Sequence, residues 1–240
     1  MGGAPRPAPE NPVGFTALGS EIDGAFARFC RMEAAALHDV TAAPLSDAEI
    51  AAMPCAFGTA MNLLDRAGVT DGQRVLVTGA SGGVGLAAVQ LAALRGAQVT
   101  GIAAEAKADA VRDAGAAEVI GRDAVPEPRL YDAVIDLVGG PGWAALIRTL
   151  RPGGHYAVAG AIAGPVVEAD LRDIYLRDIT LHGCTFQPPE TFRRLVDLMN
   201  AGALRPLVSA TYPLADIVRA QADFVAKRYP GKLVLIPEAA

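Results

Sequence analysis

The sequence predicts an α/β fold in which a doubly wound, six-stranded parallel sheet carries helices on both faces. Three observations predict it. Short strand-like runs alternate with helical patterns from Arg74 onward, the spacing of right-handed crossovers between parallel strands. The first run, residues 75–77, is apolar on both faces, as a strand buried inside a parallel sheet should be. A glycine-dense turn at 79–85 and then a helical pattern follow it directly.

The chain before this region shows weaker signals. Residues 1–12 are rich in glycine and proline and predict a disordered or loosely attached tail. A short strand is expected at 23–29. A capping box at 46–49 predicts a helix start, Pro54 is expected to interrupt that helix, and a second helix is expected at 56–67.

The predicted elements of the sheet region follow in regular order. Strands are expected at 74–78, 98–102, 118–120, 133–137, 155–159 and 179–183, with helices at about 85–94, 107–114, 142–150 and 171–177. Beyond them the patterns predict a helix at 191–201, a strand near 208–212, a helix at 215–227 and a last strand at 232–236.

Charge and composition exclude several classes of partner. The net charge is -5 and there is no basic run, so we expect no nucleic-acid partner. The longest apolar helical stretch, at 84–94, is far shorter than the ~20 residues of a membrane span, so we expect no membrane partner. The three cysteines form no Cys-x-x-Cys pair, and we expect a reduced, cytoplasmic protein.

The glycine turn is the strongest chemical signal. Gly82 and Gly85 lack Cβ atoms, so the backbone can turn tightly, approach a pyrophosphate and pack close to the strand. The following helix directs its unpaired N–H groups and the positive end of its dipole at the same place. The sequence therefore predicts a Rossmann-type dinucleotide-binding domain whose pyrophosphate lies on Ser81, Gly82, Gly83, Val84 and Gly85.

Six blocks together resemble one family, the medium-chain dehydrogenase/reductase superfamily, on its quinone-oxidoreductase-like and zinc-binding-dehydrogenase side. They are PCAFGTA at 54–60, VTGASGGVG at 77–85, YDAVIDLVG at 131–139, LRPGGHYAVAG at 150–160, DITLHG at 178–183 and GKLVL at 231–235. The resemblance implies NAD(P)-dependent hydride transfer to or from a carbonyl, alcohol or enone/quinone substrate. It also implies a homodimer formed through the edge strand at 179–183.

The chain departs from the family pattern in two places. Ala80 stands where the first glycine of the usual fingerprint is expected, as in the quinone-reductase branch. Family members begin with a GroES-like catalytic domain, of which this chain resembles only a last fragment at 19–40. We expect an N-terminally shortened member: residues 1–45 as tail and GroES-like β remnant, 46–206 as the NAD(P)-binding domain, and 207–240 returning to pair with the remnant. No catalytic residue is assigned, and turnover is expected to be weak.

The cofactor is expected to be NADP, with NAD the less favoured choice. An acidic residue that binds the ribose 2′-hydroxyl of NAD normally follows the second strand, but Ala103 stands at that strand's tip. Lys107 matches the position at which NADPH-using relatives place a lysine on the 2′-phosphate, although Glu105 nearby would favour NAD.

The resemblance assigns further residues to the cofactor. Thr59 is expected against the nicotinamide, Val138 along the path of the cofactor, and Gly160 with Ala161 beside the nicotinamide ring, whose carboxamide would bond backbone groups of Cys184 to Phe186. Cys55 matches a ligand of the catalytic zinc in related alcohol dehydrogenases. The other ligands would lie in the missing domain, so we expect a buried thiol at a helix start and no zinc.

Two function hypotheses remain open. The first is an NADP(H)-dependent oxidoreductase. The second is a non-catalytic nucleotide-binding or oligomerisation module that has lost its substrate domain. A short-chain dehydrogenase is excluded because no tyrosine is followed by lysine at the Tyr-x-x-x-Lys spacing of that class.

Overall fold

The computed structural model describes residues 17–124 and 126–238. The tail expected at 1–12 lies outside the described residues. The chain divides into two compact units: one is Thr59–Thr185, and the other joins the chain up to Gly58 with the chain from Phe186 onward. The predicted domain limits at 45 and 206 stay a prediction.

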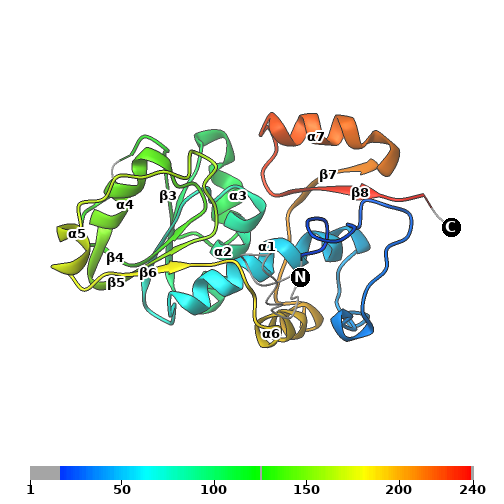
Figure 1. Ribbon diagram of the computed structural model, residues 1–240, viewed down its shortest axis with the longest axis horizontal. Helices are drawn as coiled ribbons and strands as arrows, with labels where there is room; N and C mark the ends of the chain where they lie inside the picture. The colour runs from blue at the N-terminus through cyan, green and yellow to red at the C-terminus, as the bar shows by residue number, and fades with distance from the viewer. Residues whose placement is uncertain (1–16, 125, 239–240) are drawn as a thin grey trace. The chain divides into compact units, whose positions relative to one another are not determined.

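The unit Thr59–Thr185 is built on a six-stranded, all-parallel sheet (Figure 1). The strand order is β3-β2-β1-β4-β5-β6, with β6 at one edge. This confirms the predicted fold class. The strands are β1 (Arg74–Val77), β2 (Gln98–Ile102), β3 (Glu118–Ile120), β4 (Tyr131–Asp136), β5 (Leu150–Val158) and β6 (Thr180–Gly183).

Helices connect these strands and cover both faces of the sheet, with α2 and α3 on one side and α4 and α5 on the other (Figure 1). The helices are α2 (Gly83–Leu94), α3 (Ala108–Asp113), α4 (Trp143–Thr149) and α5 (Arg172–Tyr175), and the 3₁₀ turns are η2 (Glu105–Lys107) and η3 (Gly140–Gly142). Strand β1 is fully buried from its second residue, which is why its sequence is apolar without alternation.

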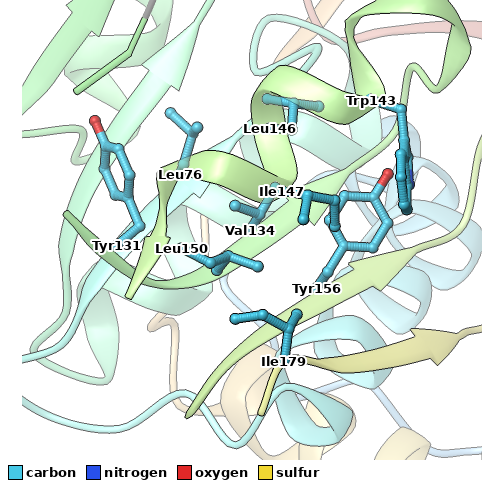
Figure 2. Packing of buried hydrophobic residues seen from close by; sticks show 9 residues of the cluster. All are labelled: Leu76, Tyr131, Val134, Trp143, Leu146, Ile147, Leu150, Tyr156 and Ile179. Atoms are coloured by element: carbon cyan, nitrogen blue, oxygen red, sulfur yellow. The ribbon is translucent and has the colours of Figure 1, made fainter. Parts of the chain in front are cut away.

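A hydrophobic cluster fills the space between α4 and the sheet (Figure 2). Ile147 and Leu146 of α4 face Val134 of β4, and all three side chains are buried. Trp143 packs edge-on against Tyr156, with ring centroids 6.0 Å apart. The interlocking of these side chains fixes α4, and with it the loop that leads into α4 from β4.

Helix α1 (Asp47–Arg66) corrects one expectation, because Pro54 lies inside a single continuous helix instead of interrupting it. The capping box at its start is confirmed: the Ser46 N–H donates to Glu49 Oε2 at 2.8 Å, and the Glu49 N–H donates to Ser46 Oγ at 3.4 Å. A proline inside a helix removes one backbone hydrogen bond. Met53 and Phe57 flank it and are buried, so packing compensates for the lost bond.

The strand expected at 23–29 is wrong. Described residues 17–46 hold only an isolated bridge between Leu18 and Ile22 and a 3₁₀ turn, η1 (Ala34–Ala36). Phe26 and Phe29 are 71% and 74% exposed. A strand needs a partner that satisfies its backbone groups, and the structure pairs no strand with this segment.

The C-terminal strands also pair differently from the expectation. After α6 (Pro189–Asn200), strand β7 (Val208–Pro213) leads through η4 (Leu214–Asp216) and α7 (Ile217–Val225) to β8 (Lys232–Ile236). β7 and β8 pair with each other in parallel as a separate two-stranded sheet, with α7 in the crossover between them. The expected pairing with residues 19–40 is therefore wrong, because this βαβ unit supplies its own strand partner.

Candidate dinucleotide-binding site

The strand order places a topological switch point between β1 and β4, from which the chain winds outward in opposite directions. In open α/β sheets, ligands bind outside the carboxyl ends of the strands at such a point. The segments that follow β1, β2, β4, β5 and β6 all lie along this edge, because every strand of the sheet runs parallel to its neighbours. The predicted cofactor residues of the unit Thr59–Thr185 that follow these strands therefore share one edge.

The glycine turn after β1 is tightly folded. Gly79 has a positive φ of 58°, and its carbonyl accepts a hydrogen bond from the Gly82 N–H at 3.0 Å. A Cβ atom on Gly85 would lie 2.2 Å from that same carbonyl oxygen and 2.7 Å from Ala80 Cα. Only glycine at position 85 allows the first turn of α2 to lie against the turn backbone.

The N-terminus of α2 fits a phosphate group. The cap residue is Gly82, and no side chain caps the helix. The first N–H groups of a helix have no partner within the helix, and together with the helix dipole they attract an anion. Ser81 is buried, Gly83 and Val84 are partly exposed, and Gly82 is exposed. An approaching pyrophosphate would therefore meet backbone N–H groups.

The structure explains why Ala80 is tolerated where a glycine is usual. Gly101 of β2, which pairs with Val77 of β1, lies against Ala80: a Cβ atom added to Gly101 would lie 3.0 Å from Ala80 Cβ and 2.6 Å from Val111 Cγ1. The missing side chain at position 101 makes room for the extra methyl group at position 80. Reasoning from the sequence missed this compensation, although a glycine inside the β-branched run of β2 is its visible sign.

The end of β2 lies beside the glycine turn, since the Ala80 N–H donates to the Ile102 carbonyl at 3.1 Å. Ala103 is buried at the strand tip, so no carboxylate occupies that place. The η2 turn then carries Glu105, which is exposed, and Lys107, which is half-buried at the start of α3. This arrangement suits a cation that binds a phosphate at the end of β2.

The end of β4 holds a buried carboxylate, Asp136, to which the sequence analysis assigned no role. Asp136 is 0% exposed. Its oxygens accept hydrogen bonds from Thr78 Oγ1 at 2.5 Å, from the Val138 N–H at 2.9 Å, from the Gly139 N–H at 3.2 Å, and from the Tyr156 hydroxyl. Its position at the end of a strand buried along its whole length could have drawn attention to it. Burial and the charge of Asp136 raise the pKa of Tyr156, so this hydroxyl stays a donor.

The loops after β4 and β5 are joined by backbone contacts. The Ala163 N–H donates to the Val138 carbonyl at 2.9 Å, and the Gly140 N–H donates to the Gly164 carbonyl at 3.0 Å. A Cβ atom on Gly160 would lie 2.5 Å from the Leu137 carbonyl oxygen. The predicted residues Val138 and Gly160, with exposed Ala161, are thus brought together at one place on the edge.

The remaining predicted residues are less closely grouped. Cys184 follows β6 and is buried, and its N–H donates to the Val158 carbonyl at 2.9 Å. The expected hydrogen bond to the nicotinamide carboxamide would therefore have to use a different backbone group of this segment. Burial raises the pKa of its thiol. Thr59 opens this unit on α1, whereas Phe186 belongs to the other unit.

Cys55 is exposed in the middle of α1, which corrects the expectation of a buried thiol at a helix start. The expectation assumed a helix break at Pro54, and the continuous helix removes that premise. Within 17–124 and 126–238, no group of three or more His, Cys, Asp and Glu side chains is placed to hold a metal ion.

No helix in the same part of the chain is long and apolar enough to span a membrane.

A histidine pair links β5 to the edge strand β6. His155 Nδ1 and His182 Nε2 are 2.9 Å apart, and the two rings are stacked. Burial lowers the pKa of His182, and the neighbouring His155 and the positive charge of Arg66 lower it further. His182 is therefore harder to protonate in the folded chain than in the unfolded chain.

This difference predicts a pH-dependent stability. The contribution of His182 is complete above the unfolded pKa of about 6.5 and is lost as the pH falls through the lower pKa of the folded state. We expect the free energy of unfolding to fall less steeply between pH 7 and pH 5 in His182→Asn than in the wild type, with parallel curves between pH 7 and pH 8. Urea titrations across this range measure it. Equal slopes between pH 7 and pH 5 would contradict the assignment.

Comparison with known proteins agrees with this geometry. The family model described as zinc-binding dehydrogenase matches residues 83–201. An acryloyl-coenzyme A reductase of Metallosphaera sedula is 32% identical over 220 residues, which cover 90% of this chain and 66% of that protein. The chain belongs to the medium-chain dehydrogenase/reductase superfamily.

Solved structures of the superfamily show the same fold. A proposed alcohol dehydrogenase from Sinorhizobium meliloti 1021 is 45% identical with a TM-score of 0.78, over 82% of this chain and 57% of that one. The 2-octenoyl-CoA carboxylase reductase CinF, solved with NADP and 2-octenoyl-CoA, is 28% identical with a TM-score of 0.75, over 80% and 50%. The chain therefore spans between half and two thirds of the length of these superfamily members.

Proposed function

We propose that this chain binds NADP(H) at the carboxyl edge of its six-stranded sheet and serves hydride transfer to or from a carbonyl, an alcohol, or a double bond conjugated to a carbonyl. One observation carries the proposal. The α2 N-terminus has no side-chain cap and lies on a glycine turn that a Cβ atom at position 85 would obstruct. The relatives named above support the reaction class, since one is a reductase of an acryloyl thioester and another was solved with NADP and an enoyl thioester.

Different residues of this chain would bind different parts of the cofactor. The N–H groups of Gly83 and Val84 would hold the pyrophosphate, and Lys107 would bind the 2′-phosphate. The loops that carry Val138, Gly160 and Ala161 would position the nicotinamide end and exclude water from it. The cofactor supplies the hydride when it is bound.

The preference for NADPH has a direct test. Lys107→Ala removes a charge-assisted contact and should weaken NADPH binding by about 1–2 kcal/mol, roughly tenfold, with NADH binding almost unchanged. Calorimetric titration with both dinucleotides measures this. Lys227→Ala is the matched control, because it removes a lysine outside the unit Thr59–Thr185. If the wild type binds NADH as tightly as NADPH or more tightly, the choice of cofactor is wrong and Glu105 becomes the discriminating residue.

Two further parts of the proposal concern assembly and metal. A homodimer through the edge of β6 is proposed because β6 ends the sheet and leaves one side of the strand for another chain. We propose no zinc site in this chain, since Cys55 lies exposed on α1 and the described residues place no group of three ligands together.

A further inference from the structure

We propose that Asp136 is a positioning residue for three segments of the carboxyl edge: the glycine turn after β1, the loop after β4 and the loop after β5. It would hold them in the arrangement that binds the dinucleotide before the ligand arrives. The inference rests on the proposed function, and it assigns a role to a carboxylate that would not itself touch the substrate. It is carried by the hydrogen bonds that this side chain accepts and by the segments from which they come.

The donors to Asp136 come from three different strands or loops. Thr78 follows the last residue of β1, Tyr156 lies in β5, and Val138 and Gly139 lie in the loop after β4. The threonine hydroxyl also accepts a hydrogen bond from the Leu137 N–H at 2.9 Å, so the first three residues of the β4 loop all donate into the same network. A single carboxylate thus ties the backbone of this loop to both neighbouring strands.

The network continues into the segments that would touch the cofactor. Thr78 directly precedes Gly79, and a Cβ atom on Gly79 would lie 3.2 Å from Val138 Cγ2, so the glycine turn and the β4 loop are in close contact. On its other side, Val138 accepts the Ala163 N–H through its carbonyl. A displacement of Val138 would therefore move both the turn before α2 and the loop after β5.

The burial of Asp136 indicates that the carboxylate does more than fill space. Its donors are two hydroxyls and two backbone N–H groups, all of them neutral, and the side chain is wholly removed from solvent. Burying a carboxylate is costly, and the cost is offset only when each lone pair has a donor. The side chain can therefore be satisfied only while the loops keep this arrangement, which makes the loop geometry and the network cooperative.

Preorganised loops bind a ligand more tightly because less freedom is lost on binding. In Asp136→Asn, one of the two acceptor oxygens becomes an NH2 group, which would face either the Tyr156 hydroxyl or the Thr78 hydroxyl and the Val138 N–H, so at least one donor of the network would lose its acceptor. Tyr156→Phe is a milder change that removes one donor and leaves the other three. If Asp136→Asn fails to fold, Tyr156→Phe carries the test.

The experiment measures loop order and affinity separately in the full chain. Amide hydrogen exchange without ligand, followed by NMR, reports the Val138 and Gly139 N–H groups relative to those inside β4. Calorimetry then gives the affinity for NADPH. Ile147→Val is the control, because Ile147 is buried in the cluster that contains Tyr156 but donates nothing to the network.

The expected result is that Asp136→Asn and Tyr156→Phe raise the relative exchange rate of the two loop amides and weaken NADPH binding, by about tenfold for Asp136→Asn and less for Tyr156→Phe. Ile147→Val should change neither. Unchanged relative exchange in both variants, with affinity within twofold of the wild type, would overturn the positioning role. A wild type that binds neither NADPH nor NADH would instead overturn the proposed function and, with it, the link between this network and cofactor affinity.

Discussion

Gly85→Val is expected to lower the affinity for NADPH by about a hundredfold or more, because it would displace the Gly83 and Val84 N–H groups from the pyrophosphate and a hydrogen bond to a charged group contributes about 1.5–3 kcal/mol. The Cβ atom would lie 2.2 Å from the Gly79 carbonyl oxygen and 2.8 Å from the Ala80 carbonyl carbon. Both atoms belong to the backbone, so no side chain can rotate away, and α2 must move off the turn. The N–H groups that would hold the pyrophosphate move with the helix.

Gly121→Val is the matched control for this substitution. A Cβ atom on Gly121 meets nothing within 4 Å, and this glycine follows β3. Calorimetric titration with NADPH should show near wild-type affinity for the control. Far-ultraviolet circular dichroism at the titration temperature confirms that both variants are folded. NADPH binding by Gly85→Val within threefold of the wild type would show that the turn does not hold the cofactor.

The second large effect concerns stability. Ile147→Ala should lower the free energy of unfolding by about 2–5 kcal/mol, because it removes three carbons from a fully buried site between α4 and the sheet (Figure 2). Domains are stable by only about 5–15 kcal/mol, so this single change removes much of the margin.

Urea unfolding measures that loss, with Val218→Ala as its control. Val218 lies on α7 and is 77% exposed, so its truncation should change the free energy of unfolding by less than about 0.5 kcal/mol. A loss below 1 kcal/mol for Ile147→Ala would contradict the close packing of the cluster.

The six-stranded sheet could be predicted from the sequence because strand-like runs rich in apolar residues alternate with helical patterns and are separated by glycine, alanine or polar turns. These turn residues are a local signal, and the right-handedness of parallel crossovers then limits the number of possible topologies. Helix α1 could not be predicted through Pro54, since its continuity depends on the burial of Met53 and Phe57 by tertiary packing. The pairing of β7 with β8 was missed because periodicity shows that a strand exists and does not show its partner.

Part of the candidate site could likewise be predicted from the sequence, and part of it could not. The glycine turn and Lys107 could be proposed from the sequence because they lie close together in the chain and follow predicted strands. The Asp136 network could not, since its donors Thr78 and Tyr156 are 58 and 20 residues away and converge only in the folded sheet. The compensation of Ala80 by Gly101 is likewise a contact between two segments, the glycine turn and β2, that meet only in the folded chain.

The central claim is that the carboxyl edge of the sheet holds an NADP(H) dinucleotide, and the most direct test is to observe which backbone amides respond to NADPH. Titration of the isotope-labelled chain, followed by two-dimensional NMR, should give saturable shifts that are largest for Gly82, Gly83 and Val84 and that extend to Lys107. Shifts of Lys107 should be smaller with NADH, which lacks the 2′-phosphate. Saturable shifts confined to the β7–β8 unit, or the absence of any saturable shift at the glycine turn, would contradict the claim.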